Sequence, residues 1–405
     1  MKRLLPLLLF TVVLFFTVAC GKEAPVATEG EEIPVQTEEK VTAGTENEET
    51  ESLPATSESV TTTTAPTTTT KAPTTTTKAP TATTTKVPVT TTKKAEDSYS
   101  YTPTLNYTRL PEKAGELYNS PAGGITGNEN LYKKMVNAYL NYETRVPIAV
   151  DESPFAVLNM LRFHFPLFFA DTKIEVDFAS TLEYANITYT TTRAEHFRLI
   201  ESFEKRVKSL LAAPYGSTDA EKALTVYIRY CESLDYDDAL AAIPLAWDYL
   251  YYGDNPRYDE GYRALMEGKG VCSGFAIGYS FLLSQMGLDS YCVFAGGTRD
   301  AHAWTAMKLN GKWYFADPTA DAEWPGMTNP IFRFGGNVTE RLLAGYPKAG
   351  FRYSNCIGSS DFLSVTDSRF QQLYDRQAYA PVIDYENHSV KFKSPNTFTY
   401  TLSLA

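Results

Sequence analysis

The sequence predicts an α+β fold in which one main helix packs on an antiparallel sheet. Residues 273–286 favour a helix that is apolar on most of its faces, and Gly287 follows them as a helix stop. Residues 301–309 and 312–317 have the composition of strands, and the Asn310-Gly311 pair between them is a strong signal for a type I′ turn. A helix followed by a hairpin therefore forms the predicted core.

The residues before the main helix are predicted to form a small α+β unit that supports this core. Apolar spacing and charge pattern indicate its helices, and alternation indicates the strands. The predicted helices are 131–144, 154–163, 193–212 and 219–233, and the predicted strands are 172–177, 183–190 and, within the core, 290–295. In the first helix Met135, Ala138, Tyr139 and Tyr142 are expected on the buried side. After residue 331 only 389–404 alternates, so this part is expected to add strands or to cover the core.

Cys272 lies at the predicted start of the main helix, after Gly270. A thiol becomes a good nucleophile only when its thiolate is stabilised. The first turn of a helix offers backbone N–H groups without helical partners and the positive end of the dipole, and both favour a thiolate. The same N–H groups can receive the oxyanion of a tetrahedral intermediate. Cys272 is therefore the candidate nucleophile.

The predicted hairpin brings His302 close to Asp317. A two-residue turn fixes the register, which places Trp304 opposite Asp317 and His302 two residues further along on the same face. Such diagonal neighbours are roughly 7–8 Å apart, which the two side chains can span. We therefore expect Asp317 to orient His302, and His302 to face the thiol of Cys272.

Simpler interpretations of these residues are a buried structural cysteine and a structural histidine in a strand. Three chemically matched residues, two of them joined by the register, favour a catalytic triad instead. A metal site is a poor alternative, because Cys-x-x-Cys and His-x-x-x-His spacings are missing and the histidines are scattered at 164, 196, 302 and 388. We expect no metal and no cofactor.

Three motifs resemble one known family. They are Gly-Val-Cys-Ser-Gly-Phe-Ala at 270–276, His-Ala-Trp at 302–304, and Gly-Lys-Trp-Tyr-Phe-Ala-Asp-Pro-Thr at 311–319. Together they are similar to the core of the transglutaminase-like superfamily of papain-like cysteine enzymes, over a stretch from about Tyr230 to Asp321.

This resemblance implies a papain-like core with Cys272 as nucleophile, His302 as general base and acid, and Asp317 as the orienting residue. It implies no required metal. Two positions depart from the family pattern: Thr305 stands where asparagine is frequent, and Ala320 where bacterial members often have tryptophan. Both departures are expected to reshape the substrate groove without removing a triad residue.

Aromatic residues are concentrated before the nucleophile segment and around the hairpin. Either these rings wall a substrate groove, or they belong to a loop-rich edge of the core, where tyrosine is frequent. Under the first interpretation the groove residues are Trp304, Tyr236 and Trp247. The wider aromatic set is Tyr249, Tyr251, Tyr252, Tyr258, Tyr262, Trp313 and Trp324.

The N-terminus has the pattern of an export signal, with Lys2 and Arg3, an apolar run at 4–16, and small residues before Cys20. The apolar run is shorter than the roughly 20 residues that a membrane-spanning helix needs. It resembles a bacterial lipoprotein signal, which implies that Cys20 is lipidated and that the protein is held on the outer face of the bacterial cell membrane. An ordinary cleaved signal is the alternative, and it also places the protein outside the cytoplasm.

The segment after the signal, rich first in Glu and then in Thr and Pro, is predicted not to fold. It has almost no large apolar side chains to offset its chain entropy, and recurring proline makes it an extended spacer. A passive tail is the alternative. The predicted divisions are a signal peptide at 1–19, a tether at 20–100, an α+β supporting region at 101–229, a transglutaminase-like core at 230–330 and a C-terminal extension at 331–405.

Charge and cysteine content exclude two further classes. The formal net charge is −11 and no basic stripe is present, so nucleic acid is not an expected partner. Besides Cys20 and Cys272, an odd number of cysteines remains (Cys231, Cys292 and Cys356), which does not indicate a disulfide framework. We expect these three to be buried thiols, and one bridge among them is the alternative.

These observations predict a surface-anchored cysteine acyl-transfer enzyme that acts through a thioester on peptide or carboxamide bonds of proteins or cell-wall peptides. Hydrolysis and crosslinking share the thioester, and for an exported bacterial member hydrolysis is favoured. The alternative is a non-catalytic surface module on the same fold, because a fold alone does not establish activity. An intact triad favours the enzyme over the non-catalytic module, because a module that only binds does not need all three residues.

Overall fold

The computed structural model describes residues 98–119, 124–176, 183–243, 258–295, 302–322, 326–335 and 367–405. As predicted, helices are combined with antiparallel sheets, and these residues fall in one compact unit, Lys86–Ala405. A continuous cluster of buried apolar side chains runs through them. In this part of the chain no helix has the length and apolar character needed to cross a membrane. The predicted signal peptide, Cys20, nearly all of the tether and Cys356 lie outside the described residues.

Helix α10 (Cys272–Gln285) packs on the sheet formed by β6 (Ser290–Ala295), β7 (His302–Leu309) and β8 (Lys312–Ala316). The strand order is β6-β7-β8, and both pairings are antiparallel. Asn310 and Gly311 have φ of 49° and 79°, as a type I′ turn requires, and Leu309 pairs with Lys312. The predicted helix, strands and hairpin register are confirmed.

Helix α10 is enclosed along most of its length, since all residues from 273 to 283 are buried. Helix α9 (Glu260–Met266) lies against it, and two glycines allow neighbours to approach closely. A Cβ added to Gly274 would lie 2.7 Å from the carbonyl oxygen of Glu260. One added to Gly278 would lie 2.0 Å from the hydroxyl of Tyr230. The helix therefore tolerates no larger residue at these positions without movement of its neighbours.

The sequence did not predict the segment that leads into α10. Here β4 (Asp235–Tyr236) and β5 (Lys269–Gly270) form a short parallel pair. Helix α8 (Asp238–Ala241) follows β4, and the Asp237 carboxylate caps it by accepting from the N–H of Leu240 at 2.9 Å. This pair holds the chain extended just before Cys272.

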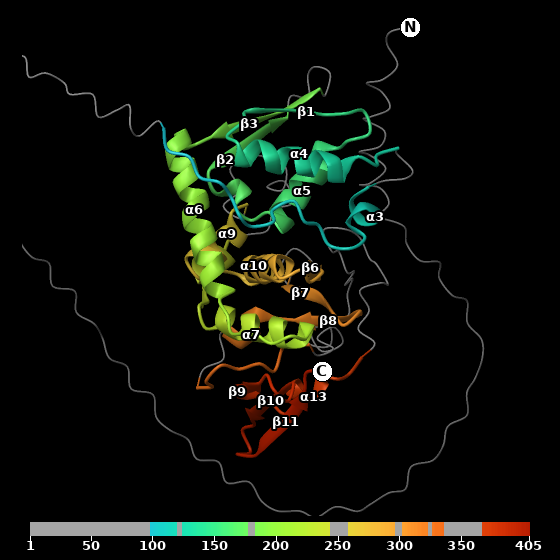
Figure 1. The fold of residues 1–405 in the computed structure, drawn as a ribbon, viewed down its shortest axis with the longest axis vertical. Helices are drawn as coiled ribbons and strands as arrows, with labels where there is room; N and C mark the ends of the chain where they lie inside the picture. Colours follow the sequence, from blue (N-terminus) through green and yellow to red (C-terminus); the bar gives the residue numbers. More distant parts are fainter. Residues whose placement is uncertain are drawn as a thin grey trace, which may run out of the picture. The chain divides into compact units, whose positions relative to one another are not determined.

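The N-terminal half forms a second antiparallel sheet with the order β1-β3-β2 and a set of helices. Its elements are α3 (Ala114–Tyr118), α4 (Asn128–Leu140), β1 (Arg145–Pro147), α5 (Pro154–His164), η2 (Phe168–Ala170), β2 (Thr172–Val176), β3 (Tyr184–Tyr189), α6 (Arg193–Leu210) and α7 (Asp219–Cys231). Figure 1 shows α6 running along the side of the unit, from this sheet to α7. Helices α6 and α7 begin with capping boxes at Thr192 and Thr218, which fix their starts.

The first predicted helix is displaced. It was expected at 131–144 but is observed at Asn128–Leu140. Met135 and Tyr139 are buried as predicted, whereas Tyr142 lies beyond the helix with φ of 60°. The N–H of Glu143 donates to the carbonyl of Ala138 at 2.8 Å, so a left-handed residue ends the helix and turns the chain into β1.

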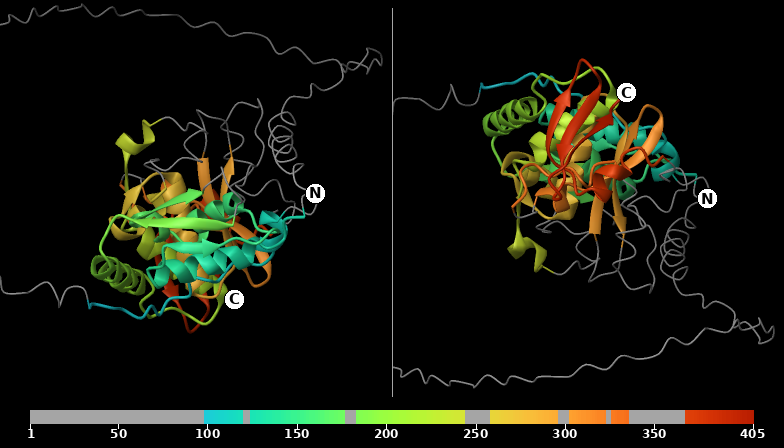
Figure 2. Two further views of the ribbon diagram at one scale, coloured as in Figure 1. Left: turned by 90° about the horizontal axis from the view of Figure 1, so that it is seen from above. Right: turned by 90° about the horizontal axis from the view of Figure 1, so that it is seen from below.

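The C-terminal residues form a third antiparallel sheet, with the order β11-β10-β9. The elements after the hairpin are α11 (Pro318–Ala322), α13 (Gln371–Asp375), β9 (Tyr379–Asp384), β10 (Ser389–Lys393) and β11 (Thr399–Ser403). Seen from below, these red strands lie nearest to the viewer (Figure 2, right). The Thr218 hydroxyl donates to the carbonyl of Leu404 at 2.9 Å, so the predicted alternating tail both adds strands and packs beside α7.

The packing of α10 predicts the effect of Gly278→Ala. Helix propensity alone would stabilise this variant by up to about 1 kcal/mol. The added methyl group meets the Tyr230 hydroxyl, so we expect a net loss of about 1–3 kcal/mol in the free energy of unfolding. Urea denaturation followed by circular dichroism measures it. Ser284→Ala, at a half-buried position of the same helix, is the control with little expected change. A stabilised Gly278→Ala would contradict the close packing.

Candidate active site

The thiol of Cys272 lies at the first residue of α10, directly after the extended residue Val271. No side chain caps this helix start by a hydrogen bond, so the first-turn N–H groups are left for another acceptor. Cys272 is half-buried and packs against a small apolar cluster that includes Phe163 and Ile277. The sulfur therefore lies at the positive end of a helix with part of its surface accessible, the setting of a reactive cysteine.

His302 and Asp317 are joined by a hydrogen bond. His302 Nε2 lies 2.9 Å from Asp317 Oδ2, and the two side chains are 15% and 1% exposed. His302 begins β7, and Asp317 directly follows β8. The ladder pairs Thr305 with Ala316, so Trp304 comes next opposite Asp317 and His302 lies diagonally from it. The predicted contact between the two side chains is confirmed.

Opposing effects act on the pKa values of this pair. Burial lowers the pKa of His302, but the charge of Asp317, the hydrogen bond to it and a hydrogen bond to Cys272 raise that pKa well above its usual value. Burial raises the pKa of Asp317, yet His302 and the nearby Arg333 hold it below its ordinary value. Because Nε2 is bound to Asp317, Nδ1 is left for the sulfur.

Asp317 is fixed by three neighbouring segments. Its Oδ1 accepts from the N–H of Thr319 at 3.2 Å, and its own N–H donates to the carbonyl of Arg333 at 3.2 Å. Its carbonyl accepts from the hydroxyl of Tyr227, on α7, at 2.9 Å. The residue that orients the histidine is thus tied to elements far away in the sequence.

A second buried carboxyl group, Asp321 on α11, shares these neighbours and was not predicted from the sequence. Its Oδ2 accepts from the Tyr227 hydroxyl at 2.8 Å and from the N–H of Arg333 at 3.0 Å. Burial raises the pKa of Asp321 to about 8, and the negative charge of Asp317 adds to the rise. Asp321 is therefore a neutral acid at pH 7. Its position one helical turn after Asp317 is the only sequence signal that could have indicated it.

Thr305, one of the departures from the family pattern, links the two parts of the site. It is completely buried, and its hydroxyl donates to the carbonyl of Ala276 at 3.0 Å. The strand that begins with His302 is thereby tied to the helix that begins with Cys272. Thr305 faces α10, so the expectation that it reshapes the substrate groove stays a prediction, and any such effect would act through the position of this helix.

The three residues predicted to line a substrate groove differ in burial and position. Trp304 is completely buried, with its ring centre 6.1 Å from that of His302, so the prediction that it lines a groove is wrong. Its strand is the central one, and residues 303–307 of that strand are buried on both faces. Tyr236 is half-buried and pairs in register with Gly270, so it flanks the nucleophile segment. Trp247 lies outside the described residues.

Those members of the wider aromatic set that the structure describes belong to the edge of the core. Tyr258 stacks on Phe169 and Tyr262 on Phe203, with ring centres 4.8 and 6.0 Å apart. Tyr249, Tyr251, Tyr252 and Trp324 lie outside the described residues. Cys231 and Cys292 are buried thiols as expected, and burial raises the pKa of Cys231 well above its usual value. Among the described residues no group of three or more His, Cys, Asp or Glu is placed to hold a metal ion.

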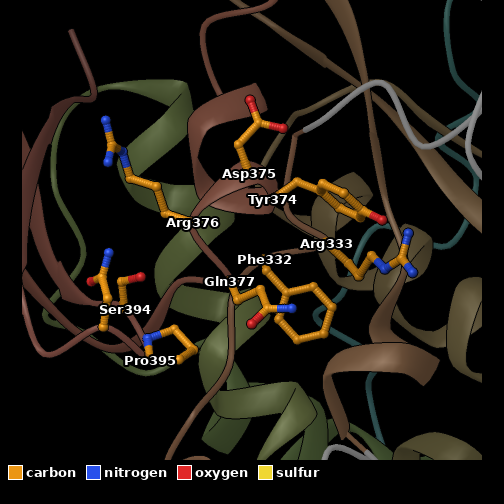
Figure 3. Close-up of a pocket in the computed structure, with 9 residues that line it drawn as sticks. Phe332, Arg333, Tyr374, Asp375, Arg376, Gln377, Ser394 and Pro395 are labelled. Atoms are coloured by element: carbon orange, nitrogen blue, oxygen red, sulfur yellow. The ribbon is translucent and has the colours of Figure 1, made fainter. Parts of the chain in front are cut away.

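A pocket of about 490 Å³ lies between the segment after α11 and the C-terminal sheet (Figure 3). In Figure 3 the side chains of Arg333 and Arg376 point to opposite sides, so their charges do not converge on one ligand. The pocket is lined by Phe332, Arg333, Tyr374, Asp375, Arg376, Gln377, Ser394, Pro395 and Asn396. The three triad residues are not among them, so this pocket is separate from the candidate active site.

Comparison with known proteins defines the class of the core. Residues 209–318 match the family model of the transglutaminase-like superfamily, and this stretch holds Cys272, His302 and Asp317. The chain therefore contains a transglutaminase-like domain, and the match supports an enzyme of the cysteine acyl-transfer type. Residues 98–208 of the described structure precede the match.

Two solved structures are similar to the chain at low identity. The crystal structure of a TGase is 15% identical with a TM-score of 0.25, over 43% of this chain and 49% of that one. The chain thus spans about half the length of that TGase. The (BACCR)NAT3 arylamine N-acetyltransferase from Bacillus cereus, an enzyme with a Cys-His-Glu catalytic triad, is 9% identical with a TM-score of 0.22, over 50% of this chain and 92% of that one. No curated protein matches the sequence.

The raised pKa of Asp321 predicts a pH-dependent stability. Between the ordinary value of 3.8 and the folded value of about 8, the folded protein holds a proton that the unfolded chain releases. Stability therefore falls as pH rises through this window, by at most about 1.4 kcal/mol per pH unit, and levels off above it. Asp321→Asn removes this titration and should flatten the decline.

Urea denaturation of both proteins over this pH range measures the difference. Asp235→Asn, at a side chain that is 76% exposed, is the control and should leave the slope unchanged. Equal slopes in the parent protein and in Asp321→Asn would show that Asp321 is ionised in the folded state.

Proposed function

We propose that the protein is a cysteine acyl-transfer enzyme with Cys272 as nucleophile, His302 as general acid and base, and Asp317 as the residue that orients the histidine. The observation that carries this proposal is the chain of contacts at the end of the hairpin. Asp317 Oδ2 is 2.9 Å from His302 Nε2, and Cys272, at the start of α10, is the other group that raises the pKa of the same imidazole. The family match over residues 209–318 supports the same class of reaction.

The reaction proceeds through a thioester. The thiolate of Cys272 attacks the carbonyl carbon of a peptide or carboxamide bond, and the N–H groups of the first turn of α10 receive the oxyanion. The imidazolium of His302 gives its proton to the nitrogen, the C–N bond breaks and the amine leaves. Water or a second amine then attacks the thioester, its proton passes to the neutral imidazole, and the thiolate is restored. The two outcomes differ only in the acceptor.

We favour water as the acceptor, which makes the protein a peptidase or amidase and not a crosslinking enzyme. The export pattern of the N-terminus supports proteins and cell-wall peptides as the acyl donors, because these are the substrates that an exported bacterial protein meets. We further propose that Cys20 is lipidated and that residues 20–100 tether the domain to the outer face of the membrane. The extended Thr- and Pro-rich composition supports a spacer of considerable reach.

Cys272→Ala tests the nucleophile. It should abolish hydrolysis of cell-wall peptides and protein substrates while the fold is kept, because alanine suits the first turn of a helix. Asp317→Asn should also fold and should lose several orders of magnitude in rate, because an amide favours the wrong histidine tautomer. Release of free amine measures turnover, circular dichroism measures folding, and Cys231→Ala is the control with activity retained.

Turnover by purified Cys272→Ala at the parent rate would refute the assignment. The non-catalytic alternative predicts a different result: no turnover by the parent protein, and a Cys272 sulfur that iodoacetamide alkylates no faster than it alkylates glutathione at neutral pH.

Cys20→Ala tests the anchor. The parent protein should fractionate with membranes and need detergent for extraction, whereas Cys20→Ala should be released or should fail to mature. Immunoblots of membrane, soluble and medium fractions measure this. Recovery of the whole parent protein in the medium, with an unlipidated N-terminus, would contradict the lipoprotein proposal and leave the catalytic proposal untouched.

A further inference from the structure

Three buried polar side chains form a network directly behind the first turn of α10. Arg162 Nη2 donates to Glu260 Oε1 at 2.7 Å, and Ser273 Oγ donates to Glu260 Oε2 at 2.7 Å. The side chain of Glu260 is 0% exposed and that of Arg162 is 7% exposed. Both carboxylate oxygens are engaged, and one of their donors is the residue next to Cys272.

The network is in direct contact with helix α10, which begins with Cys272. The carbonyl oxygen of Glu260 lies 2.7 Å from where a Cβ on Gly274 would be, so no space separates α9 from this turn. On α5, the residue after Arg162 is Phe163, which packs in the apolar cluster that Cys272 joins. Helix α5 thus contributes two successive side chains to the surroundings of the thiol, from a segment that precedes the family match.

A buried carboxylate close to a thiol disfavours the thiolate, because like charges repel strongly where water is excluded. A cation paired with the carboxylate offsets that repulsion. We propose that Glu260 is a positioning residue for Cys272, which it holds in place through Ser273. Its pairing with Arg162 sets the charge behind the helix start, and hence the pH at which the thiol becomes reactive. This inference rests on the function proposed above, because it assigns a role within the same site.

Other charged or titratable groups lie on the elements packed around this turn. They include Asp237, Asp259, Arg263 and Lys269 on the α9 and β5 side, His302, Asp317, Asp321 and the thiol of Cys292 on the sheet side, and His164 on α5. Asp237 is paired with Arg263 at 2.7 Å, and these two charges offset each other. Within the part of the chain that the structure describes, only Arg162 and Ser273 hydrogen-bond to the carboxylate of Glu260. The Arg162–Glu260 pair can therefore be altered separately from the other charges.

The pH dependence of Cys272 alkylation tests the inference in the full-length protein. Iodoacetamide is the probe, and mass spectrometry of the peptide that holds Cys272 measures the rate. Arg162→Gln leaves the carboxylate uncompensated and should raise the midpoint of the rate profile by about one pH unit. Glu260→Gln leaves the cation uncompensated and should lower the midpoint by a similar amount. The double variant should return toward the parent midpoint, and Arg162→Lys, which keeps the charge, should stay close to it.

Breaking a buried ion pair is strongly destabilising, so circular dichroism must show that the single variants are folded. Ser273→Ala is a milder test, because it keeps both charges and removes only the hydroxyl that links Glu260 to the turn. It should slow alkylation at neutral pH about fivefold, the loss expected for one hydrogen bond. Ser280→Ala is the matched control: it removes a buried, hydrogen-bonded hydroxyl farther along the same helix and should leave the rate unchanged.

An unchanged midpoint in both Arg162→Gln and Glu260→Gln would overturn the inference. Shifts of both in the same direction would also overturn it, because loosening of the helix produces that result without any effect of charge. If the single variants do not fold, the test rests on Ser273→Ala. An unaltered alkylation rate in that variant would refute the inference. A different result is expected if the proposed function itself is wrong. Cys272 of the parent protein then reacts with iodoacetamide no faster than glutathione does, and the changes at Arg162 and Glu260 do not alter this.

Discussion

Helix α10 is apolar on most of its faces and buried on every side from Ser273 to Leu283, and such a helix is stable only when it is shielded from water. The β6–β7 part of the sheet covers one side, and α5, α7, α9 and α11 cover others. Gly274 and Gly278 let two of these neighbours approach the helix axis closely. Because Cys272 is the first residue of this helix, the enclosure that stabilises the fold also fixes the position of the thiol, while its end of the helix remains partly accessible.

Three carboxyl groups around this helix are buried but differ in state, and their partners explain the difference. Asp317 faces the imidazole of His302, which keeps it ionised. Asp321 shares a tyrosine hydroxyl with Asp317 and lies close to its charge, so it holds a proton at neutral pH. Glu260 is matched by the guanidinium of Arg162. Where water is excluded each pairing is strong and each unmatched charge is costly, so small changes in partner alter the state of a carboxyl group.

The part of the site that could be predicted from the sequence is the part that depends on local rules. A two-residue turn sets the hairpin register by itself, so His302 could be matched with Asp317 without knowledge of the remaining fold. Arg162 and Glu260, in contrast, are 98 positions apart, and no short-range pattern relates them. The same limit explains the error at Trp304: alternation along a strand gives the register, but whether both faces are covered depends on tertiary packing.

Helix α5 lies outside the stretch that defines the superfamily, yet Arg162 and Phe163 complete the surroundings of the candidate nucleophile. A gene fusion that moved only residues 209–318 into another protein would leave Glu260 without its cation and one side of the apolar cluster open to water. The recipient would have to provide substitutes for both at once. We therefore expect residues 209–318 to fold and function only together with residues that precede them in this chain.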